Sequence, residues 1–550
     1  MVMRELVFRA RMHFYKHRYW RPIERMSKNP ASAQKKVMLQ LLYMNRNTRF
    51  GKEHSFAKIR NHFELQQNVP VQHYDALHPY IEEQRLLGAQ ALTAEQPLFY
   101  AQTSGTTGKP KYIPITDTGL AMYRQEQALF SYLQYQVCPT GFTGKALGVM
   151  GAAVEGYLDS KHAVGSVSGH LYQSLPKIIQ SRFVLPPSVS NIADYELKYL
   201  VILRLALAEP NITYAGSPNP STFLRLLDVL NQHRESLTRS LVTGRLDELN
   251  KLEKSLAKSL ERLLKSDPVR AAQISNLPEL TYANVWPELK LVTTWMGGSC
   301  GIALDSLRKK LPATTAIMEL GYQSSEFRGS IALEAENPAG IPPLHHHFFE
   351  FVEQALWDNE APVFLTLDQI TQGKIYYVII TTAAGLYRYF MNDLVQVAGF
   401  FNSTPLLRFV QKGKGVTSLT GEKLYEAQVI SAVKDVSLQY GVGSSFFVLV
   451  ANEQTLNYCL FMEAKNSVSS SINSIAAKID TQLSALNMEY QAKRNSGRLG
   501  PLTLSWLKSG TAEAYKAAHV SSGQREGQYK PTVLQYSRDL RIDLQDFAIK

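Results

Sequence analysis

The segment with the clearest chemical character is residues 103–111, which read TSGTTGKPK. It places two glycines, four hydroxyl side chains and two lysines within nine residues. Small residues let backbone N–H groups approach phosphate oxygens, hydroxyls add hydrogen-bond donors, and lysines neutralise charge. The pattern therefore indicates a loop that binds nucleotide phosphates.

Three better-known motifs are absent from the sequence. A Walker P-loop needs a glycine five positions before Gly108 and a hydroxyl residue after the lysine, but these positions hold Thr103 and Pro110. No G-x-G-x-x-G dinucleotide motif is present. Residues 165–169 read GSVSG, with Val167 where a hydrolase elbow would carry its nucleophile. The phosphate loop is therefore of another class.

This loop resembles the phosphate loop of the adenylate-forming enzymes, the superfamily of acyl-CoA synthetases, firefly luciferase and peptide-synthetase adenylation domains. Residues 321–326 read GYQSSE, where one plant branch has an aromatic followed by Ala-Ser-Ser-Glu. Residues 385–393 read GLYRYFMND, where that branch has Gly-Leu-Tyr-Arg-Tyr-Arg-Val-Gly-Asp. Similar segments in the same order are VPVQHYDALHPYIEE (69–83), FFEF (348–351), LLRFV (406–410) and GQYKP (527–531). The chain thus resembles a bacterial-type member of the auxin-responsive acyl acid amido synthetases, which in plants join auxin, jasmonate or benzoates to amino acids.

The resemblance implies an ATP site and a magnesium ligand. The residues implied for the ATP phosphates are Ser104, Gly105, Thr106, Thr107, Gly108 and Lys109. Tyr322 would lie against the adenine, with Gly321 and Gln323 beside it. Glu326 would bind Mg²⁺, a hard cation that prefers carboxylate oxygens together with substrate phosphate. Asp393 would accept hydrogen bonds from both ribose hydroxyls.

Two lysines near the C-terminus are candidates for the adenylation step. Lys530 in GQYKP is the first candidate and Lys423 in TGEK the second, because either cation would stabilise charge on the α-phosphate. Both follow the segment 411–415, QKGKG, where Lys412 and Gly413 are expected to form a hinge. We therefore predict a large ATP- and acyl-acid-binding domain over residues 1–410 and a small mobile domain over residues 416–550.

Two departures from the family pattern fall near this site. Phe390, Met391 and Asn392 replace Arg-Val-Gly before the aspartate, so the backbone around Asp393 is expected to differ. Residues 295–300, WMGGSC, replace a Thr-Gly-Ser-Met region, so the surface that binds the acyl carboxylate is expected to have changed. An auxin or jasmonate substrate therefore does not follow from the resemblance.

The elements that must position these residues indicate an α/β fold. The family resemblance implies mixed β-sheets with flanking helices in the large domain and an α+β small domain. Nearly continuous apolar runs predict buried strands; they lie at 146–150, 291–295, 348–352, 375–382 and 446–450. Leucines at 249, 252, 256, 260 and 263 predict a helix that ends at Asp267-Pro268. His345–His347 are assigned a packed or surface role, since neighbours along a strand point to opposite faces and do not share a metal.

The net charge of +12 is concentrated at the N-terminus. Residues 1–60 contain fifteen Lys and Arg but three Glu, so the remainder of the chain is neutral and nucleic-acid binding is not expected. Residues 1–28 mix basic with apolar and aromatic side chains. They predict either a helix packed on the main domain or a peripheral contact with an anionic membrane.

The sequence as a whole predicts a cytoplasmic enzyme, peripheral to a membrane if the second alternative holds. Cys138, Cys300 and Cys459 form no C-x-x-C pair and are too few for a disulfide framework. We expect a ligase that activates a carboxylic acid with ATP and Mg²⁺ and transfers the acyl group to an amine, which the resemblance makes an amino acid. A thiol (coenzyme A or a carrier) or hydroxyl acceptor is the alternative, and a non-catalytic membrane-associated binding protein is the alternative of another class.

Overall fold

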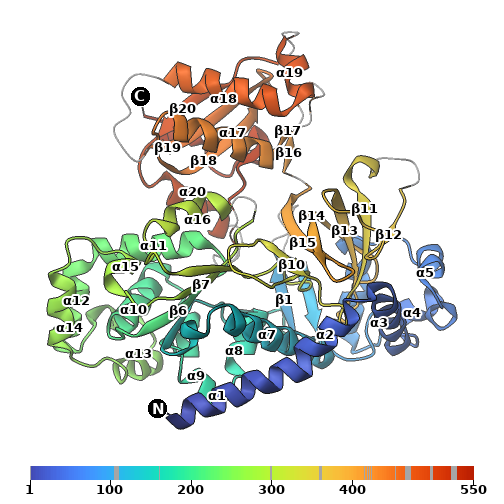
Figure 1. Ribbon diagram of the computed structural model, residues 1–550, viewed down its shortest axis with the longest axis horizontal. Helices are drawn as coiled ribbons and strands as arrows, with labels where there is room; N and C mark the ends of the chain where they lie inside the picture. Colours follow the sequence, from blue (N-terminus) through green and yellow to red (C-terminus); the bar gives the residue numbers. More distant parts are fainter. Residues whose placement is uncertain are drawn as a thin grey trace. The chain divides into compact units, whose positions relative to one another are not determined.

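The computed structural model describes residues 2–103, 111–159, 161–297, 300–357, 362–413, 415–417, 419, 422, 424–452, 454–464, 472–495, 499–521, 529 and 531–549. The chain divides into two compact units (Figure 1). The large unit comprises residues 1–295, 309–391 and 395–408. The small unit comprises residues 296–308, 392–394 and 409–550. Strand β14 (Tyr389–Phe401) therefore contributes residues to both.

Among the residues that the structure describes, the large unit contains three sheets, which confirm the expected α/β class. The parallel sheet has the order β3 (Lys145–Gly148), β6 (Ile212–Gly216), β7 (Leu291–Thr294) and β8 (Ala316–Glu319). The second has the order β2 (Lys111–Ile115), β1 (Phe99–Thr103), β5 (Ala163–Gly165) and β4 (Gly156–Tyr157). The third, in which β14 and β15 continue into the small unit, has the order β12 (Leu365–Thr366), β11 (Phe348–Glu353), β13 (Ile375–Thr381), β14, β15 (Thr404–Lys412), β10 (Ala339–Ile341) and β9 (Ile331–Ala332).

Helices flank these sheets, as expected (Figure 1). Those nearest the chain start are α1 (Val2–Tyr15), a π-helical turn (Lys16–Trp20), α2 (Arg21–Met26), α3 (Pro30–Met44), α4 (Arg49–Glu53), α5 (His62–Asn68) and α6 (Tyr74–Leu87). Those further along are α7 (Asp117–Val137), α8 (Val167–Gln173), α9 (Lys177–Gln180), α10 (Tyr195–Leu207), α11 (Pro220–Gln232), α12 (Arg234–Thr243), α13 (Lys254–Glu261), α14 (Pro268–Ser275) and α15 (Tyr282–Val285). No helix among the described residues is both long and apolar enough to span a bilayer.

The apolar runs that predicted strands coincide with β3, β7, β11, β13 and β18 (Ser444–Asn452). The predicted leucine-rich helix is wrong in extent. Helix α13 ends at Glu261, and Asp267 instead caps the next helix, where its side chain accepts a hydrogen bond from the Arg270 N–H at 2.9 Å. An Asp-Pro pair suits the start of a helix as well as a stop, because proline lacks the N–H that a first turn leaves unbonded.

The N-terminal helix packs on the large unit, which confirms that alternative. Phe8 stacks on Phe142 at a centroid distance of 5.4 Å and meets Tyr135 edge-on at 5.6 Å. Met12 and Ile23 are buried. Protein contacts therefore cover part of the apolar side of this segment, while Val7 and Phe14 stay exposed.

The small unit is built on a sheet with the order β20 (Thr503–Leu507), β19 (Asn457–Ala464), β18 and β21 (Leu534–Tyr536). Alternate residues of β18 point to opposite faces. Phe447 and Leu449 pack with α17 (Glu426–Gln439) and α18 (Ile472–Leu486) in one core cluster. Phe446 and Val448 pack with Tyr515 of α20 (Thr511–Ser521) in a second core cluster. The small unit also contains α16 (Cys300–Arg308), β16 (Val416–Thr417), β17 (Leu424–Tyr425) and α19 (Met488–Asn495).

Candidate active site

The predicted phosphate loop connects two paired strands. Strands β1 and β2 are antiparallel, with Thr103 opposite Lys111. The six candidate residues from Ser104 to Lys109 lie outside the described residues, so their contacts stay predictions. At the described end of the loop, Lys111 Nζ donates to the Tyr389 hydroxyl at 3.4 Å and lies 5.6 Å from the centre of the Tyr74 ring. The end of the loop is thus tied to the strand that carries Asp393.

The predicted adenine segment forms a tight turn after β8. Gly321 has a φ of 101°, and a Cβ added there would lie 2.3 Å from the Ser330 carbonyl oxygen, so only glycine fits. The Tyr322 N–H donates to the Ser330 hydroxyl at 3.0 Å. The Tyr322 ring packs edge-on against Phe327 at 5.2 Å and is 7% exposed, which leaves only a small surface for contact with a base. Gln323 closes the turn by bridging to Arg328.

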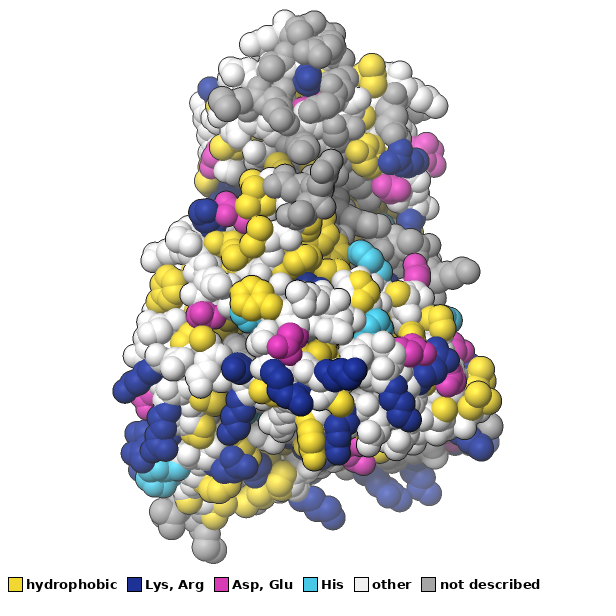
Figure 2. All heavy atoms as spheres, turned by 90° about the vertical axis from the view of Figure 1, so that its right-hand side faces the viewer, with side chains coloured by type: hydrophobic (Ala, Val, Ile, Leu, Met, Phe, Trp, Pro, Cys, Tyr) yellow, Lys and Arg dark blue, Asp and Glu magenta, His cyan; other side chains and the backbone are white. Residues whose placement is uncertain are grey.

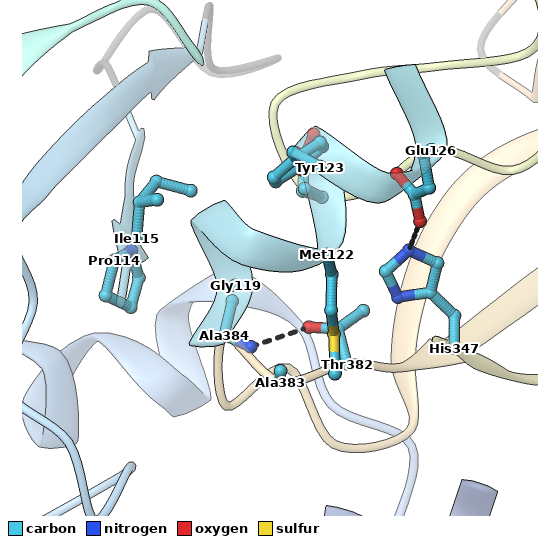
Figure 3. A pocket seen from close by; sticks show the side chains of 11 residues that line it. Pro114, Ile115, Gly119, Met122, Tyr123, Glu126, His347, Thr382, Ala383 and Ala384 are labelled. Atoms are coloured by element: carbon cyan, nitrogen blue, oxygen red, sulfur yellow. Dashed lines mark hydrogen bonds and ion pairs between the residues drawn. The ribbon is translucent and has the colours of Figure 1, made fainter. Parts of the chain in front are cut away.

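Glu326 lies in this turn and lines a small pocket of about 10 Å³, which is room for about one water molecule. The other lining residues are Pro114, Ile115, Gly119, Met122, Tyr123, Glu126, His347, Thr382, Ala383 and Ala384. Figure 3 shows that they come from β2, from the first turns of α7, from the chain before β11 and from the loop after β13. The pocket therefore lies between the strand that follows the phosphate loop, the GYQSSE turn and the chain leading into GLYRY.

Helix α7 holds these parts together. The Thr116 hydroxyl accepts a hydrogen bond from the Gly119 N–H at 3.2 Å and so caps the helix directly after β2. The Tyr123 hydroxyl donates to the Ser325 carbonyl at 3.2 Å. Burial raises the pKa of Tyr123 well above its ordinary value, so this hydroxyl remains a donor. Helix α7 thus connects the phosphate loop to the turn that carries Glu326.

A buried carboxylate on α7 binds two histidines. Glu126 Oε1 accepts hydrogen bonds from His346 Nδ1 at 2.8 Å and His347 Nε2 at 3.1 Å, and all three side chains are buried. Burial opposes ionisation of Glu126, but the two hydrogen bonds outweigh it and lower its pKa from 4.5 to about 2. Burial and His346 lower the pKa of His345 to about 3.

The histidine run therefore has the packed role expected of it, but not in the expected geometry. His345 and His346 lie in a turn before β11, so His346 and His347 can reach the same carboxylate. No group of three or more metal-ligating side chains occurs within the part of the chain that the structure describes.

Asp393 is 1% exposed, and a glycine-like backbone conformation precedes it. Asn392 has a φ of 51° at the position where the resembling family has glycine. Asparagine adopts this left-handed conformation more readily than most residues, so it can replace glycine there. The N–H of Gly413, directly after β15 at the predicted hinge, donates to the Asn392 carbonyl at 2.8 Å.

Two residues of the GLYRY segment have structural contacts. Tyr387 is fully buried, stacks on Phe50 and donates its hydroxyl to the Leu92 carbonyl at 2.9 Å. Arg388 is 2% exposed and forms an ion pair with Glu350 at 2.9 Å. Both side chains fix the chain that leads into Asp393.

The predicted hinge and the two lysines belong to the small unit. Lys412 ends β15 and Gly413 follows it, while Lys423 and Lys530 lie outside the described residues. Glu422, which precedes Lys423, is buried and accepts hydrogen bonds from the Leu419 N–H at 2.7 Å and the Tyr458 hydroxyl at 2.8 Å. The two lysine roles and the hinge stay predictions.

Comparison with known proteins gives matches along almost the whole chain. Sequence models of the GH3 family match residues 20–316 (N-terminal domain), 341–412 (central domain) and 427–539 (C-terminal domain). An indole-3-acetic acid-amido synthetase from Arabidopsis thaliana, GH3.3, is 25% identical over 92% of this chain and 90% of its own. A jasmonoyl-L-amino acid synthetase from Oryza sativa subsp. japonica, GH3.5, is 25% identical over 92% of both chains.

Solved structures share the fold. The GH3.15 acyl acid amido synthetase superposes with a TM-score of 0.84 at 21% identity, over 96% of both chains. A 2-hydroxyisobutyryl-CoA ligase in the postadenylation state superposes with a TM-score of 0.56 at 13% identity, over 95% of this chain and 93% of the ligase. The fold of the chain is therefore that of adenylate-forming ligases.

Proposed function

This chain belongs to the GH3 family, and on that basis we propose that it is an acyl acid-amido synthetase, an AMP-forming ligase. It activates a carboxylic acid with ATP as an acyl-adenylate and transfers the acyl group to an amine, an amino acid. One relative is named for a carboxylic acid that it converts to an amide, and another for a jasmonoyl group and an L-amino acid. The observation that carries the proposal is the match of all three family domains in order along one chain.

The reaction has two steps because a carboxylate is a poor electrophile. Its attack on the α-phosphate forms a P–O bond to AMP and releases pyrophosphate. The amine then attacks the acyl carbonyl, the C–O bond to AMP breaks, and AMP leaves with the electron pair. Catalysis of the first step is mostly positioning and stabilisation of charge on the α-phosphate. In our proposal Lys530 supplies that stabilisation, with Lys423 as the second candidate.

Residues of the large unit and β14 would hold the nucleotide. Ser104, Thr106, Thr107 and Lys109 would bind its phosphates. The small exposed surface of Tyr322 would contact the adenine, and Asp393 would accept hydrogen bonds from both ribose hydroxyls. The buried contacts of Tyr387 and Arg388 support this role by fixing the chain that leads into Asp393.

Glu326 fits a magnesium site. Glu326 is one of the residues that line the pocket, and Mg²⁺ is commonly bound by one or two carboxylates together with substrate phosphates and water. Bound Mg²⁺ would neutralise phosphate charge. The turn from Gln323 to Arg328 would hold the carboxylate in place, since the Ser324 N–H donates to the Phe327 carbonyl at 2.9 Å.

The nature of the acceptor is tested by the mass of the product. The chain is supplied with an acid, Mg-ATP, pooled amino acids and coenzyme A in one reaction. We expect an N-acyl amino acid and AMP. A thioester in its place would make the protein an acyl-CoA ligase, and an ester would identify a hydroxyl acceptor. No Mg-ATP binding would revive the alternative of a non-catalytic binding protein.

A cytoplasmic location with peripheral membrane contact through residues 1–28 is a further part of the proposal. Phe8 and Met12 pack on protein, and Val7 and Phe14 are exposed, so such contact would depend mainly on charge, with few apolar side chains left to insert. The basic side chains of this segment that lie exposed are Arg9, Lys16, Arg18, Arg21, Arg25 and Lys28. Figure 2 shows Lys and Arg side chains gathered across the lower half of one face.

Vesicle flotation tests the membrane contact. We expect the full chain to float with anionic vesicles at low salt and to be released at about 1 M salt, where the Debye length is about 3 Å. A double variant, Arg18→Glu with Arg21→Glu, should not float. Equal flotation of both proteins, or of neither, would refute the contact.

A further inference from the structure

The segment of residues 72–74, directly before and at the start of α6, connects two of the predicted ATP-binding segments of the large unit. On one side it pairs in parallel with Tyr389, the first residue of β14. The Gln72 N–H donates to the Arg388 carbonyl, and the Phe390 N–H donates to the Gln72 carbonyl, both at 2.9 Å. Gln72 is buried, so water does not compete for these bonds. The segment is therefore held against the chain that begins β14.

On its other side the segment contacts the strand that follows the phosphate loop, through the hydroxyl of Tyr74. In the described sheet β2 is an edge strand, and an edge strand has backbone groups that need partners from outside the sheet. The Tyr112 N–H donates to the Tyr74 hydroxyl at 2.8 Å, and this hydroxyl donates a longer bond to the Tyr112 carbonyl at 3.5 Å. Burial raises the pKa of Tyr74 to about 12, so the hydroxyl keeps its hydrogen. Tyr74 thus fixes the backbone one residue after the loop.

Lys111, the last residue of the phosphate-loop motif, contacts both ends of this connection. Its Nζ lies 5.6 Å from the centre of the Tyr74 ring, a distance at which an aromatic face attracts a cation. The same Nζ donates to the Tyr389 hydroxyl at 3.4 Å. Both tyrosines are buried. The side chain of Lys111 is therefore held between a tyrosine of α6 and a tyrosine of β14.

We propose that Tyr74 and Tyr389 are positioning residues for ATP: Tyr74 fixes the backbone at the end of the phosphate loop, and the two together fix Lys111 relative to the strand that carries Asp393. The inference rests on the proposed function, which assigns the phosphates to the loop and the ribose to Asp393. The distance between these two groups must match the nucleotide, and a site held in place before binding loses less freedom when ATP binds. Both tyrosines act through the chain they hold and not through contact with the nucleotide.

Removal of single hydroxyls tests this role. Tyr74→Phe keeps the ring beside Lys111 but leaves the Tyr112 N–H without its acceptor. Tyr389→Phe removes only the acceptor for Lys111 Nζ, and it decides the question if Tyr74→Phe does not fold. The matched control is Tyr80→Phe on the same helix, because the Tyr80 hydroxyl donates to Glu53 and contacts neither ATP-binding segment.

Two quantities are measured for each protein: the Kd of Mg-ATP by equilibrium dialysis, and the KM values for ATP and for the acid in pyrophosphate release. We expect Tyr74→Phe to raise the Kd and the KM for ATP by about 10-fold, the size of one lost hydrogen bond. Tyr389→Phe should raise them by about threefold, since its bond to Lys111 is long. The KM for the acid should stay within about twofold, and Tyr80→Phe should match the wild type throughout.

A role in stability alone gives a different result. It would reduce the folded fraction, and with it the rate at saturation, without changing the Kd of Mg-ATP. That result for both Tyr74→Phe and Tyr389→Phe would overturn the inference, as would equal rises in the KM for ATP and for the acid, or the same loss of ATP affinity in Tyr80→Phe. Wild-type protein that binds Mg-ATP but releases no pyrophosphate with any acid would instead refute the proposed function, while the Kd values would still decide the role of the two tyrosines.

Discussion

The ion pair between Arg388 and Glu350 gives a prediction whose size follows from its burial. Their side chains are 2% and 1% exposed, and Arg388 Nε lies 2.9 Å from one oxygen of Glu350 and 3.2 Å from the other. Arg388 also donates to the Val69 carbonyl at 2.7 Å. The substitution Glu350→Gln removes the negative charge but keeps the side chain's volume, so the guanidinium is left buried without a counter-charge.

Removing one partner of a buried pair typically costs about 3–5 kcal/mol, because the remaining charge is desolvated and uncompensated. A matched control lies three positions along the same strand. Glu353 pairs with Lys374 at 2.8 Å, but these side chains are 26% and 50% exposed. Glu353→Gln should therefore cost less than about 1 kcal/mol, as solvated pairs do.

The measurement is urea unfolding followed by circular dichroism, with both single variants compared at the same pH and salt. We expect a large loss in the free energy of unfolding for Glu350→Gln and almost none for Glu353→Gln. The double variant Glu350→Leu with Arg388→Met should recover most of the loss, since it buries no charge. Equal small losses for the two single variants would refute the claim that this pair anchors the chain before Asp393.

Three further predictions concern the site and its frame. Gly321→Ala should lower the free energy of unfolding by about 2 kcal/mol or more, because its φ is 101° and the added Cβ would lie 2.3 Å from a carbonyl oxygen. The control is Gly373→Ala, which should cost about 1 kcal/mol because its φ is 84° but the space around it is open. Equal losses for the two variants in urea unfolding would contradict this prediction. The pKa of Glu126 is lowered from 4.5 to about 2, so its contribution of about 3 kcal/mol is present above pH 5 and is lost as the pH falls toward 2. An acid titration of stability should therefore be flatter for Glu126→Gln, and an unchanged acid slope would refute this. Lys530→Ala should slow pyrophosphate release by about 10²-fold, and a normal rate would transfer the role to Lys423.

Strands and motif positions could be predicted from local sequence, because a strand buried on both faces reads as a continuous apolar run. The runs at β7 and β11 are examples. The ends of helices were harder to predict from the sequence, because Asp267-Pro268 forms the N-terminal cap of α14 and does not end α13. For the backbone before Asp393 the sequence indicated only a difference from the family pattern; the positive φ at Asn392 depends on its tertiary surroundings and could not be predicted.

The Glu126–His347 contact had no local signal in the sequence. The two residues are 221 positions apart, and a glutamate on a helix is ordinarily solvated. A run of three histidines before an apolar strand indicated only packing. That His347 and Glu326 line one pocket became visible only when α7 and the turn before β11 were placed in space.

The most direct test of the central claim is pyrophosphate release from Mg-ATP across aryl, indolyl and fatty carboxylic acids, each with and without pooled amino acids. The proposed function predicts release that depends on one class of acid and increases when amino acids are added, with an N-acyl amino acid as the product. Release that is indifferent to amino acids would contradict amide synthesis, and failure to bind ATP would contradict the assignment as an enzyme.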